Sequence, residues 1–276
     1  MIGLEGVSVI YDGRRVVREV SLSVPAGGWT CLIGPNGAGK TTVLRAISGL
    51  VPFDGMVRID GSPLGEVGRR RLAQLVAFVP QRPSVPEAMT VVDYVLIGRT
   101  PYISYLGTES TRDLEAVGEA LERLELGSLA GRTLGSLSGG EVQRAVMARA
   151  LAQQAPVLLL DEPTSSLDVG HQQHVLELVD ALRLERGLTV LSSMHDLTLA
   201  GQFAMSLVML SEGRVVATGS GRSVLTEAAI REHYGASVRV MEDADGRILV
   251  LPTRAPPEAA EPEVVEGRDP MSRTGF

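Results

Sequence analysis

The sequence predicts an α/β protein built around a buried, largely parallel sheet, and three observations support this class. A glycine-rich loop, residues 34–42, lies between the apolar run 29–33 and a helix-like segment at 43–47. The run 157–160 is continuously apolar, which suits a parallel strand covered on both faces. Between about residues 90 and 153, apolar positions recur at helical spacing and indicate a helical insertion between two halves of the sheet.

The composition of the 276-residue chain is ordinary for a globular protein with one large or two modest domains. A formal net charge of −7 argues against a surface that coats nucleic acid, and the only basic run, Arg69–Arg71, suits a solvated helix face. Cys31 is the one cysteine, which excludes an internal disulfide, and its apolar surroundings predict a core residue. No secretory signal is visible and no apolar stretch is long enough to span a bilayer, so we expect any membrane span on another chain.

The remaining segments are mostly predicted as short strands. Residues 2–24 alternate in polarity around Asp12 and Gly13, which predicts two antiparallel strands or a hairpin, with Tyr11 closing the first strand. Further strands are expected at 55–61, 75–79 and 189–193, and further hairpins at 206–218 and 238–251. Within the helical insertion, the aromatic loop 101–107 is expected to be exposed. Proline and glutamate dominate from Thr253 onward, which predicts a disordered tail.

The glycine-rich loop fits the pattern G-x-x-x-x-G-K-[ST] in the strand–loop–helix context that gives the pattern meaning. Its residues are Gly34, Pro35, Asn36, Gly37, Ala38, Gly39, Lys40, Thr41 and Thr42. Glycines let backbone N–H groups point at phosphate oxygens, and the following helix adds the positive end of its dipole. Lys40 is expected on the β- and γ-phosphates and Thr41 on Mg²⁺. A plain strand–helix turn is the alternative, but the pattern and context favour a nucleoside triphosphate.

Two carboxylates and a histidine are expected at the same edge of the sheet. Asp161 and Glu162 follow an apolar strand, and ligands of parallel sheets collect at the carboxyl ends of strands. Asp161 is a candidate Mg²⁺ ligand through water, and Glu162 a candidate for polarising the attacking water. Taken alone, Asp161 and Glu162 could simply begin a loop. The presence of a phosphate loop in the same chain favours a functional role for them. His195 ends another strand and is expected at the γ-phosphate, whereas nothing indicates a metal site at His171 and His174.

A second glycine pair precedes a helix at Leu137, Ser138, Gly139, Gly140 and Glu141. Ser138 with Glu141 three residues later forms the pattern of a capping box, which is one explanation of the segment. The two glycines cost helix stability and leave bare backbone N–H groups at a helix start. That cost favours a second anion site.

Together these motifs resemble the ATPase subunit of ATP-binding-cassette (ABC) transporters over roughly residues 2–250. The matching segments are the Walker A loop at 34–42, Walker B at 157–162, the signature at 137–141, the Q-loop glutamine Gln81, the D-loop at 166–168, the switch histidine His195 and the adenine-stacking aromatic Tyr11. Glu141 departs from the commonest signature, which has glutamine, but importer subunits often carry this glutamate.

The resemblance implies an α/β fold with a P-loop NTPase (RecA-like) core sheet, an antiparallel β-subdomain and an inserted α-helical subdomain. The nucleotide-binding domain is expected at 1–252, with the helical subdomain at about 82–155 and a C-terminal β-hairpin at about 236–252. Residues 253–276 form the expected tail.

The resemblance also implies roles for individual residues and for cofactors, namely ATP and Mg²⁺. Lys40 and the loop amides bind phosphate, Thr41, Gln81 and Asp161 complete the Mg²⁺ shell, Glu162 polarises water, and His195 holds the γ-phosphate. In the family two subunits pair head to tail, so that Ser138 and Gly140, with Gly139, Glu141 and Asp168 beside them, face the partner's ATP. ATP binding then closes the dimer, and hydrolysis lets it open.

Three features resemble those of importer ATPases for iron-siderophore complexes, haem or vitamin B12. They are the loop at 97–102, the short helical insertion and the added hairpin after residue 236. This implies a homodimer at the cytoplasmic face of the cell membrane, bound peripherally to transmembrane permease subunits and indirectly to a substrate-binding protein, with no nucleic acid. Other possibilities are an ABC ATPase for a different solute and a soluble ABC ATPase acting on ribosomes or DNA, which usually has two cassettes or long insertions. A non-catalytic module that only closes on ATP is disfavoured by Glu162 and His195.

Overall fold

The computed structural model describes residues 1–165 and 167–253, so Ser166 of the predicted D-loop and the predicted tail from residue 254 lie outside the described residues. The strands are β1 (Ile2–Tyr11), β2 (Arg14–Val24), β3 (Trp29–Ile33), β4 (Asp54–Ile59), β5 (Ser62–Pro63), β6 (Val76–Val79), β7 (Val157–Asp161), β8 (Thr189–Ser193), β9 (Ser206–Ser211), β10 (Arg214–Gly219), β11 (Val238–Glu242) and β12 (Ile248–Pro252). The α-helices are α1 (Lys40–Ile47), α2 (Arg69–Leu75), α3 (Val91–Leu96), α4 (Thr111–Arg123), α5 (Gly139–Ala152), α6 (Val169–Arg186), α7 (Leu197–Phe203), α8 (Gly221–Val224) and α9 (Glu227–Tyr234). Short 3₁₀ turns are η1 (Leu64–Glu66), η2 (Ile97–Arg99), η3 (Gly127–Leu129) and η4 (Leu134–Ser136).

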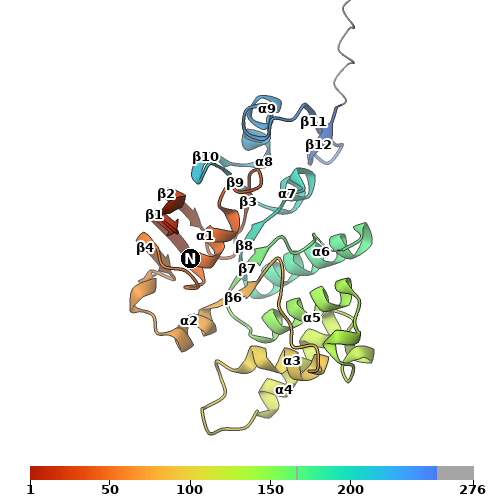
Figure 1. Cartoon of the computed structure of the whole chain (residues 1–276). Coiled ribbons are helices and arrows are strands. Elements are labelled where there is room, and N and C mark those ends of the chain that lie inside the picture. The colour runs from red at the N-terminus through yellow and green to blue at the C-terminus, as the bar shows by residue number, and fades with distance from the viewer. Residues whose placement is uncertain (166, 254–276) are drawn as a thin grey trace, which may run out of the picture.

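A six-stranded sheet in the order β10-β9-β3-β8-β7-β6 forms the centre of the molecule (Figure 1). All neighbouring pairs are parallel except β10 with β9. Along β7, Leu158 and Leu160 enter one hydrophobic core, whereas Val157 and Leu159 enter the other. Both faces are therefore buried, which explains the unbroken apolar run and confirms the predicted parallel strand.

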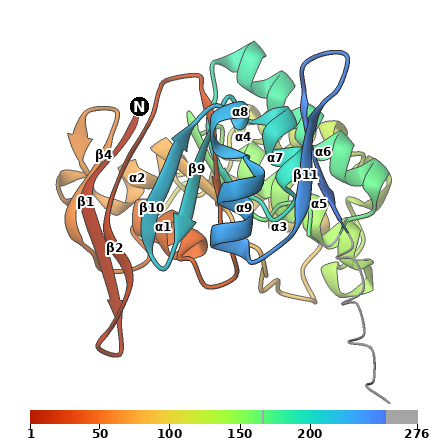
Figure 2. The same ribbon diagram turned by 90° about the horizontal axis from the view of Figure 1, so that it is seen from above.

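A second sheet, in the order β2-β1-β4-β5, is antiparallel and shares a core with α1. The turn between β1 and β2 has positive φ at both Asp12 (48°) and Gly13 (76°), as a two-residue hairpin with the twist of its strands requires. The predicted N-terminal hairpin is confirmed. Figure 2 shows this sheet on one side of the molecule and α5 and α6 on the other.

The segment between β6 and β7 is helical, as predicted, and contains α3, α4 and α5 packed on one another. Thr90, Ser110 and Ser138 cap the three helices with side-chain oxygens. The loop 101–107 is exposed at its tip, where Tyr105 is 100% and Leu106 92% accessible, in agreement with the prediction. This insertion meets the central sheet through α5, which packs beneath β6 and β7.

The C-terminal part adds two hairpins, β9–β10 and β11–β12, where the sequence predicts them. Helices α8 and α9 lie between the hairpins, and β12 contacts α7 through a hydrogen bond from Val250 N–H to Thr198 Oγ1 (3.0 Å). Among the described residues, no helix combines the length and apolar character needed to cross a membrane.

Candidate active site

The phosphate loop follows β3 and depends on glycine for its shape. Gly34, Gly37 and Gly39 have φ values of 148°, 79° and 101°, which other residues adopt only with strain. A Cβ on Gly34 would lie 2.1 Å from the carbonyl oxygen of Leu210, so backbone packing also demands glycine there. The N-terminal hairpin closes over the other end of the loop, because Val16 O lies 3.2 Å from the Cβ position of Gly39.

The N-terminus of α1 has no side-chain cap, although α3 to α9 each have one. Gly39 occupies the cap position of α1 in a left-handed conformation. The first backbone N–H groups of this helix therefore face the loop without a protein side chain to accept from them. A phosphate group fits this place, because it supplies both acceptor oxygens and negative charge to the helix dipole.

Lys40 crosses the loop and is only 5% exposed. Its Nζ donates to the carbonyl oxygens of Gly34 (2.7 Å) and Pro35 (3.2 Å). Burial lowers the pKa of Lys40, and the nearby carboxylates of Glu162 and Asp161 oppose that effect. A cation held this way is ready to contact a triphosphate lying along the loop.

The end of β7 brings Asp161 to the start of α1. Thr41 Oγ1 donates to Asp161 Oδ1 (3.0 Å), and Ser193 Oγ, at the end of β8, donates to the same oxygen (2.8 Å). Hydroxyl and carboxylate oxygens are the ligands that Mg²⁺ prefers. The Gln81 amide, which also carries an oxygen, donates through its nitrogen to the neighbouring Glu162. Among the described residues, no group of three or more His, Cys, Asp or Glu side chains is placed to hold a metal ion.

Glu162 lies at the centre of a polar cluster formed by the ends of β6, β7 and β8. Its Oε1 lies 2.5 Å from His195 Nε2, and its Oε2 accepts a hydrogen bond from Gln81 Nε2. Glu162 has φ of 50°, and its N–H donates to Ser193 O (3.2 Å) and Ser193 Oγ (3.1 Å). This uncommon backbone conformation aims a carboxylate that is 7% exposed at the partly exposed imidazole of His195.

The signature segment forms a capping box, so that explanation of its sequence is confirmed. Ser138 Oγ accepts from the Glu141 N–H (3.4 Å), and Glu141 Oε2 accepts from the Ser138 N–H (2.7 Å) and hydroxyl (2.8 Å). These bonds lower the pKa of Glu141. The capping box uses the N–H groups of Ser138 and Glu141 and does not involve those of Gly139 and Gly140, so the predicted anion site stays a proposal.

In the part of the chain that the structure describes, no residue of the phosphate loop lines the same cavity as the signature segment, residues 137–141. No hydrogen bond or ion pair among the described residues joins the two segments. Instead, a separate cavity of about 350 Å³ is lined by Ser138, Gly140, Glu141, Arg144, Leu167, Asp168 and His171. Asp168 caps α6 and accepts from the N–H of His171 (3.0 Å). Of the predicted site residues, the structure thus gathers Lys40, Thr41, Gln81, Asp161, Glu162 and His195 at one place, and Ser138, Gly140, Glu141 and Asp168 at another.

Tyr11 ends β1 opposite Arg14 and is half-buried. Its hydroxyl is buried and has no hydrogen-bond partner among the described residues. The strand pair that carries it packs against the phosphate loop through Val16 and Val17. Tyr11 packs against the hydrophobic core to which α1 also contributes, and its predicted stacking on adenine stays a prediction.

Two further residues of the site were not predicted from the sequence. Ser193 binds both Asp161 and Glu162, as described above, and Gln143 Nε2 donates to Pro163 O (3.4 Å), which links α5 to the segment after Glu162. Ser193 occupies the last position of a predicted strand, two residues before His195, and that position is the sequence signal of its role.

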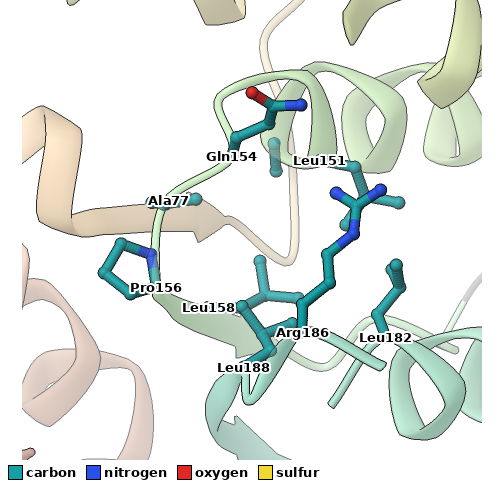
Figure 3. A pocket seen from close by; sticks show the side chains of 10 residues that line it. Ala77, Leu151, Gln154, Pro156, Leu158, Leu182, Arg186 and Leu188 are labelled. Atoms are coloured by element: carbon teal, nitrogen blue, oxygen red, sulfur yellow. The ribbon is translucent and has the colours of Figure 1, made fainter. Parts of the chain in front are cut away.

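An apolar cavity of about 360 Å³ lies elsewhere, near the N-terminal ends of β6 and β7 (Figure 3). Ala77, Leu158 and Leu182 line it, and the side chain of Arg186 extends along its edge. None of the predicted site residues lines this cavity. It lies at the edge of the sheet opposite Asp161 and is separate from the polar cluster.

Comparison with known proteins gives consistent results. A family model described as ABC transporter matches residues 17–165. The cobalamin import ATP-binding protein BtuD of Halobacterium salinarum is 42% identical over 253 residues, which cover 91% of this chain but 63% of that protein, so the chain spans less than two thirds of this relative. The hemin import ATP-binding protein HmuV of Burkholderia ambifaria is 39% identical over 270 residues, with 91% of this chain and 99% of that protein covered.

Two solved structures have the same fold. One is an ABC transporter described as of metal-chelate type, in an inward-facing conformation, with a TM-score of 0.77, 27% identity, and 91% of this chain and 97% of that chain covered. The other is a dimeric ATP-binding cassette in a post-hydrolysis state, bound to ADP and Pi, with a TM-score of 0.72, 29% identity and coverage of 80% and 99%. These matches confirm the predicted P-loop α/β fold. The chain therefore belongs to the ABC transporter family, as a member that carries the family's ATP-binding cassette.

Proposed function

We propose that this chain is the ATP-hydrolysing subunit of a membrane importer for a metal chelate such as an iron-siderophore complex, haem or cobalamin. The observation that carries the ATPase assignment is the convergence of Lys40, Thr41, Asp161, Glu162 and His195 at the carboxyl edge of the central sheet. These residues come from the ends of two neighbouring strands, β7 and β8, and from α1, so the fold itself assembles them.

The residues act on the phosphates in distinct ways. Lys40 and the N–H groups of the loop neutralise the β- and γ-phosphate oxygens. Thr41, Asp161 and Gln81 would hold Mg²⁺, which would supply positive charge to neutralise the phosphates. Glu162 accepts a hydrogen bond from the attacking water and orients it, while His195, its direct neighbour, contacts the γ-phosphate.

The separate signature cavity supports a head-to-tail homodimer. Ser138 and Gly140 line a polar cavity that is separate from the phosphate loop of their own chain, so the ATP that they contact belongs to a second copy. The solved cassette with ADP and Pi is itself a dimer. ATP bound between the two copies closes the dimer, and loss of phosphate opens it.

A permease is the partner that this function needs, and one groove suits it. A groove of about 730 Å³ lies between the end of α1, α2 and the helical insertion, and its lining includes the exposed side chains Leu50 and Ile97. An amphipathic cytoplasmic helix of the permease fits such a groove. The chain would then lie at the cytoplasmic face of the membrane, and the permease and a substrate-binding protein would select the solute.

The domain limits follow the same division. The helical subdomain, about 82–155, would move against the core sheet. Gln81 lies between the end of β6 and this subdomain and donates a hydrogen bond to Glu162, so it would link the movement to the site. The hairpin at about 236–252 would complete the nucleotide-binding domain. The relatives named for cobalamin and hemin import support the proposed class of solute.

The test is affinity purification of the full chain carrying Glu162→Gln from native membranes with Mg-ATP. Glu162→Gln should retain ATP and lose about two to four orders of magnitude in hydrolysis rate, the usual effect of a positioned base. A polytopic permease should co-purify, and its binding protein then identifies the solute. Glu232→Gln, an exposed change on α9, should retain normal turnover. Normal turnover in Glu162→Gln, or recovery of ribosomes or DNA-repair factors in place of a permease, would overturn the proposal.

A further inference from the structure

The loop between η2 and α4 is held rigidly although its tip is fully exposed. Arg70 on α2 donates to the carbonyl oxygens of Pro101 (2.9 Å), Tyr102 (3.3 Å) and Ile103 (3.1 Å). Gln74 donates to Pro101 O as well (2.9 Å). Arg70 and Gln74 of α2 thus fix the base of a loop that belongs to the helical insertion.

The stacking of Tyr102 completes this base. The guanidinium of Arg99 lies 4.1 Å from the centre of the Tyr102 ring and is itself buried, bound to Asp113 Oδ1 (2.8 Å) and Ala152 O (2.7 Å). A turn follows, closed by a hydrogen bond from the Gly107 N–H to Ser104 O (3.0 Å). Tyr105 and Leu106, here called the loop tip, occupy the middle of this turn.

The loop tip is apolar and convex. Tyr105 is 100% exposed and Leu106 92% exposed. Figure 1 shows the loop projecting below α2, outside the helices that flank it. Because the base is already fixed, the loop tip can enter another phase at little cost in conformational entropy. A tyrosine with a leucine is well suited to the boundary between lipid headgroups and acyl chains.

Positive charge lies beside the base of the loop, which Arg70 binds. Arg69, Arg70 and Arg71 at the start of α2 are exposed and, among the described residues, form no ion pair. Glu66 and Glu109 are the nearest acids along the chain on either side of the two segments. The chain as a whole has a formal charge of −7, which repels an anionic membrane, so attraction must be local to this face.

We propose that the loop tip and Arg69–Arg71 form a contact with the anionic headgroups of a lipid bilayer. Arg69 and Arg71 attract the headgroups, while Tyr105 and Leu106 enter the interface. The groove proposed for the permease is lined by Arg69, Leu72 and Pro101, so it opens on the same face. A concave groove suits a protein helix, and the convex loop tip suits a deformable lipid surface. The inference rests on the proposed function only for the expectation that this face of the chain is turned toward the membrane.

The test uses the full chain without permease and vesicles of phosphatidylcholine, alone or mixed equally with phosphatidylglycerol, at low salt. The protein should float with the mixed vesicles, stay in solution with phosphatidylcholine alone, and be released by salt. Arg69→Gln with Arg71→Gln should lower partitioning about 25-fold, since each arginine near the surface contributes a factor of about five. Tyr105→Ser with Leu106→Ser should lower it about tenfold or more.

Matched controls exist on other faces. Arg14→Gln with Arg15→Gln changes two exposed arginines of the β1–β2 hairpin, and Leu184→Ser with Met205→Ser changes two side chains that are 69% and 61% exposed. Both controls should partition like the unchanged protein. In Tyr105→Trp, the fluorescence emission should shift to shorter wavelength with mixed vesicles only, which reports insertion independently of partitioning.

Three outcomes would overturn the inference. The first is that the unchanged protein does not partition, and the second is that the controls lose as much partitioning as the variants. The third is that the loop-tip variant partitions normally into vesicles but no longer co-purifies with the permease from native membranes. The last outcome would identify the loop tip as a protein contact. ATP hydrolysis by the loop-tip variant is measured in the same preparation and should be unchanged. An unchanged protein that hydrolyses ATP but does not partition into the mixed vesicles would refute this inference alone, whereas an unchanged protein that partitions but has no ATPase would refute the proposed function alone.

Discussion

Ser193 Oγ donates a 2.8 Å hydrogen bond to Asp161 Oδ1 across neighbouring parallel strands. The same hydroxyl accepts a hydrogen bond from the N–H of Glu162 (3.1 Å). One buried serine thus holds both the proposed Mg²⁺ ligand and the backbone of the proposed base. The consequence is that Ser193 fixes the Asp161 carboxylate relative to the backbone of Glu162.

Replacing Ser193 by alanine should therefore lower both stability and activity. Asp161 loses one hydrogen bond and the Glu162 N–H loses another, so we expect about 1–3 kcal/mol of destabilisation and at least a tenfold loss in kcat. Ser192→Ala is the matched control, because Ser192 bonds Trp29 Nε1 (2.9 Å) on the other face of the same strand. It should destabilise similarly in urea unfolding but leave kcat nearly unchanged. Equal losses of kcat in both variants would contradict the assignment.

Lys40→Met should remove ATP binding without destabilising the free protein. Loss of charge-assisted hydrogen bonds to phosphate, each about 1.5–3 kcal/mol, predicts at least a hundredfold weaker affinity by calorimetry. Because burial lowers the pKa of Lys40, its charged form costs stability at neutral pH, and that cost declines as pH rises toward 10.5. Urea unfolding at pH 7 should therefore show the variant at least as stable as the unchanged protein, with the difference declining at alkaline pH. A clearly less stable variant at pH 7 would refute this reasoning.

Gly34→Ala and Gly37→Ala separate steric packing from backbone strain. At Gly34 the added Cβ meets Leu210 O at 2.1 Å, so the loop must shift and we expect about 3 kcal/mol or more of destabilisation with loss of ATP binding. At Gly37 no atom lies within 4 Å of the added Cβ, and only the positive φ of 79° is unfavourable. We expect about 1 kcal/mol there. Urea midpoints and ATP affinities of the two variants give the comparison, and similar values for both would be inconsistent with it.

Asp113 should make the helical insertion sensitive to acid. Hydrogen bonds from the side chain and backbone of Ser110, followed by the bond from Arg99, lower the pKa of Asp113 from 3.8 to about 2. The stability that the carboxylate provides is therefore present above about pH 4 and is lost as pH falls toward 2. Asp113→Asn should cost about 1–3 kcal/mol at pH 7, and the difference from the unchanged protein should vanish across that window. Glu115→Gln, exposed on the same helix, should show no such dependence in urea unfolding series.

The strands and most of the site were predictable because their signals are local. The apolar run of β7, the alternation of β1 and β2 and the glycine spacing of the phosphate loop are each written in a few consecutive residues. The order of strands in the central sheet has no local signal. The residues 189–193, for example, do not indicate that their strand lies between β3 and β7. The family resemblance supplied the fold where the pattern could not.

The residues that escaped prediction act through distant partners. Arg70 lies in a basic run that suits a solvated helix face, yet it binds three carbonyl groups more than thirty positions later. Ser193 is a small polar residue at a strand end, where its side chain could equally face solvent. In both cases the role depends on which distant residues the fold places next to the side chain, and only the assembled structure determines that.

The bonded pairs of the site come from widely separated parts of the chain: Thr41 and Asp161 are 120 positions apart, and Gln81 and Glu162 are 81 apart. During synthesis the phosphate loop therefore leaves the ribosome long before the carboxylates and Ser193 that complete its surroundings. Such long-range contacts form late, because chain closure must precede them. A nascent chain would thus acquire full nucleotide affinity only when β8 has joined the sheet, and ATP, by binding that state alone, would act as a checkpoint for completed folding.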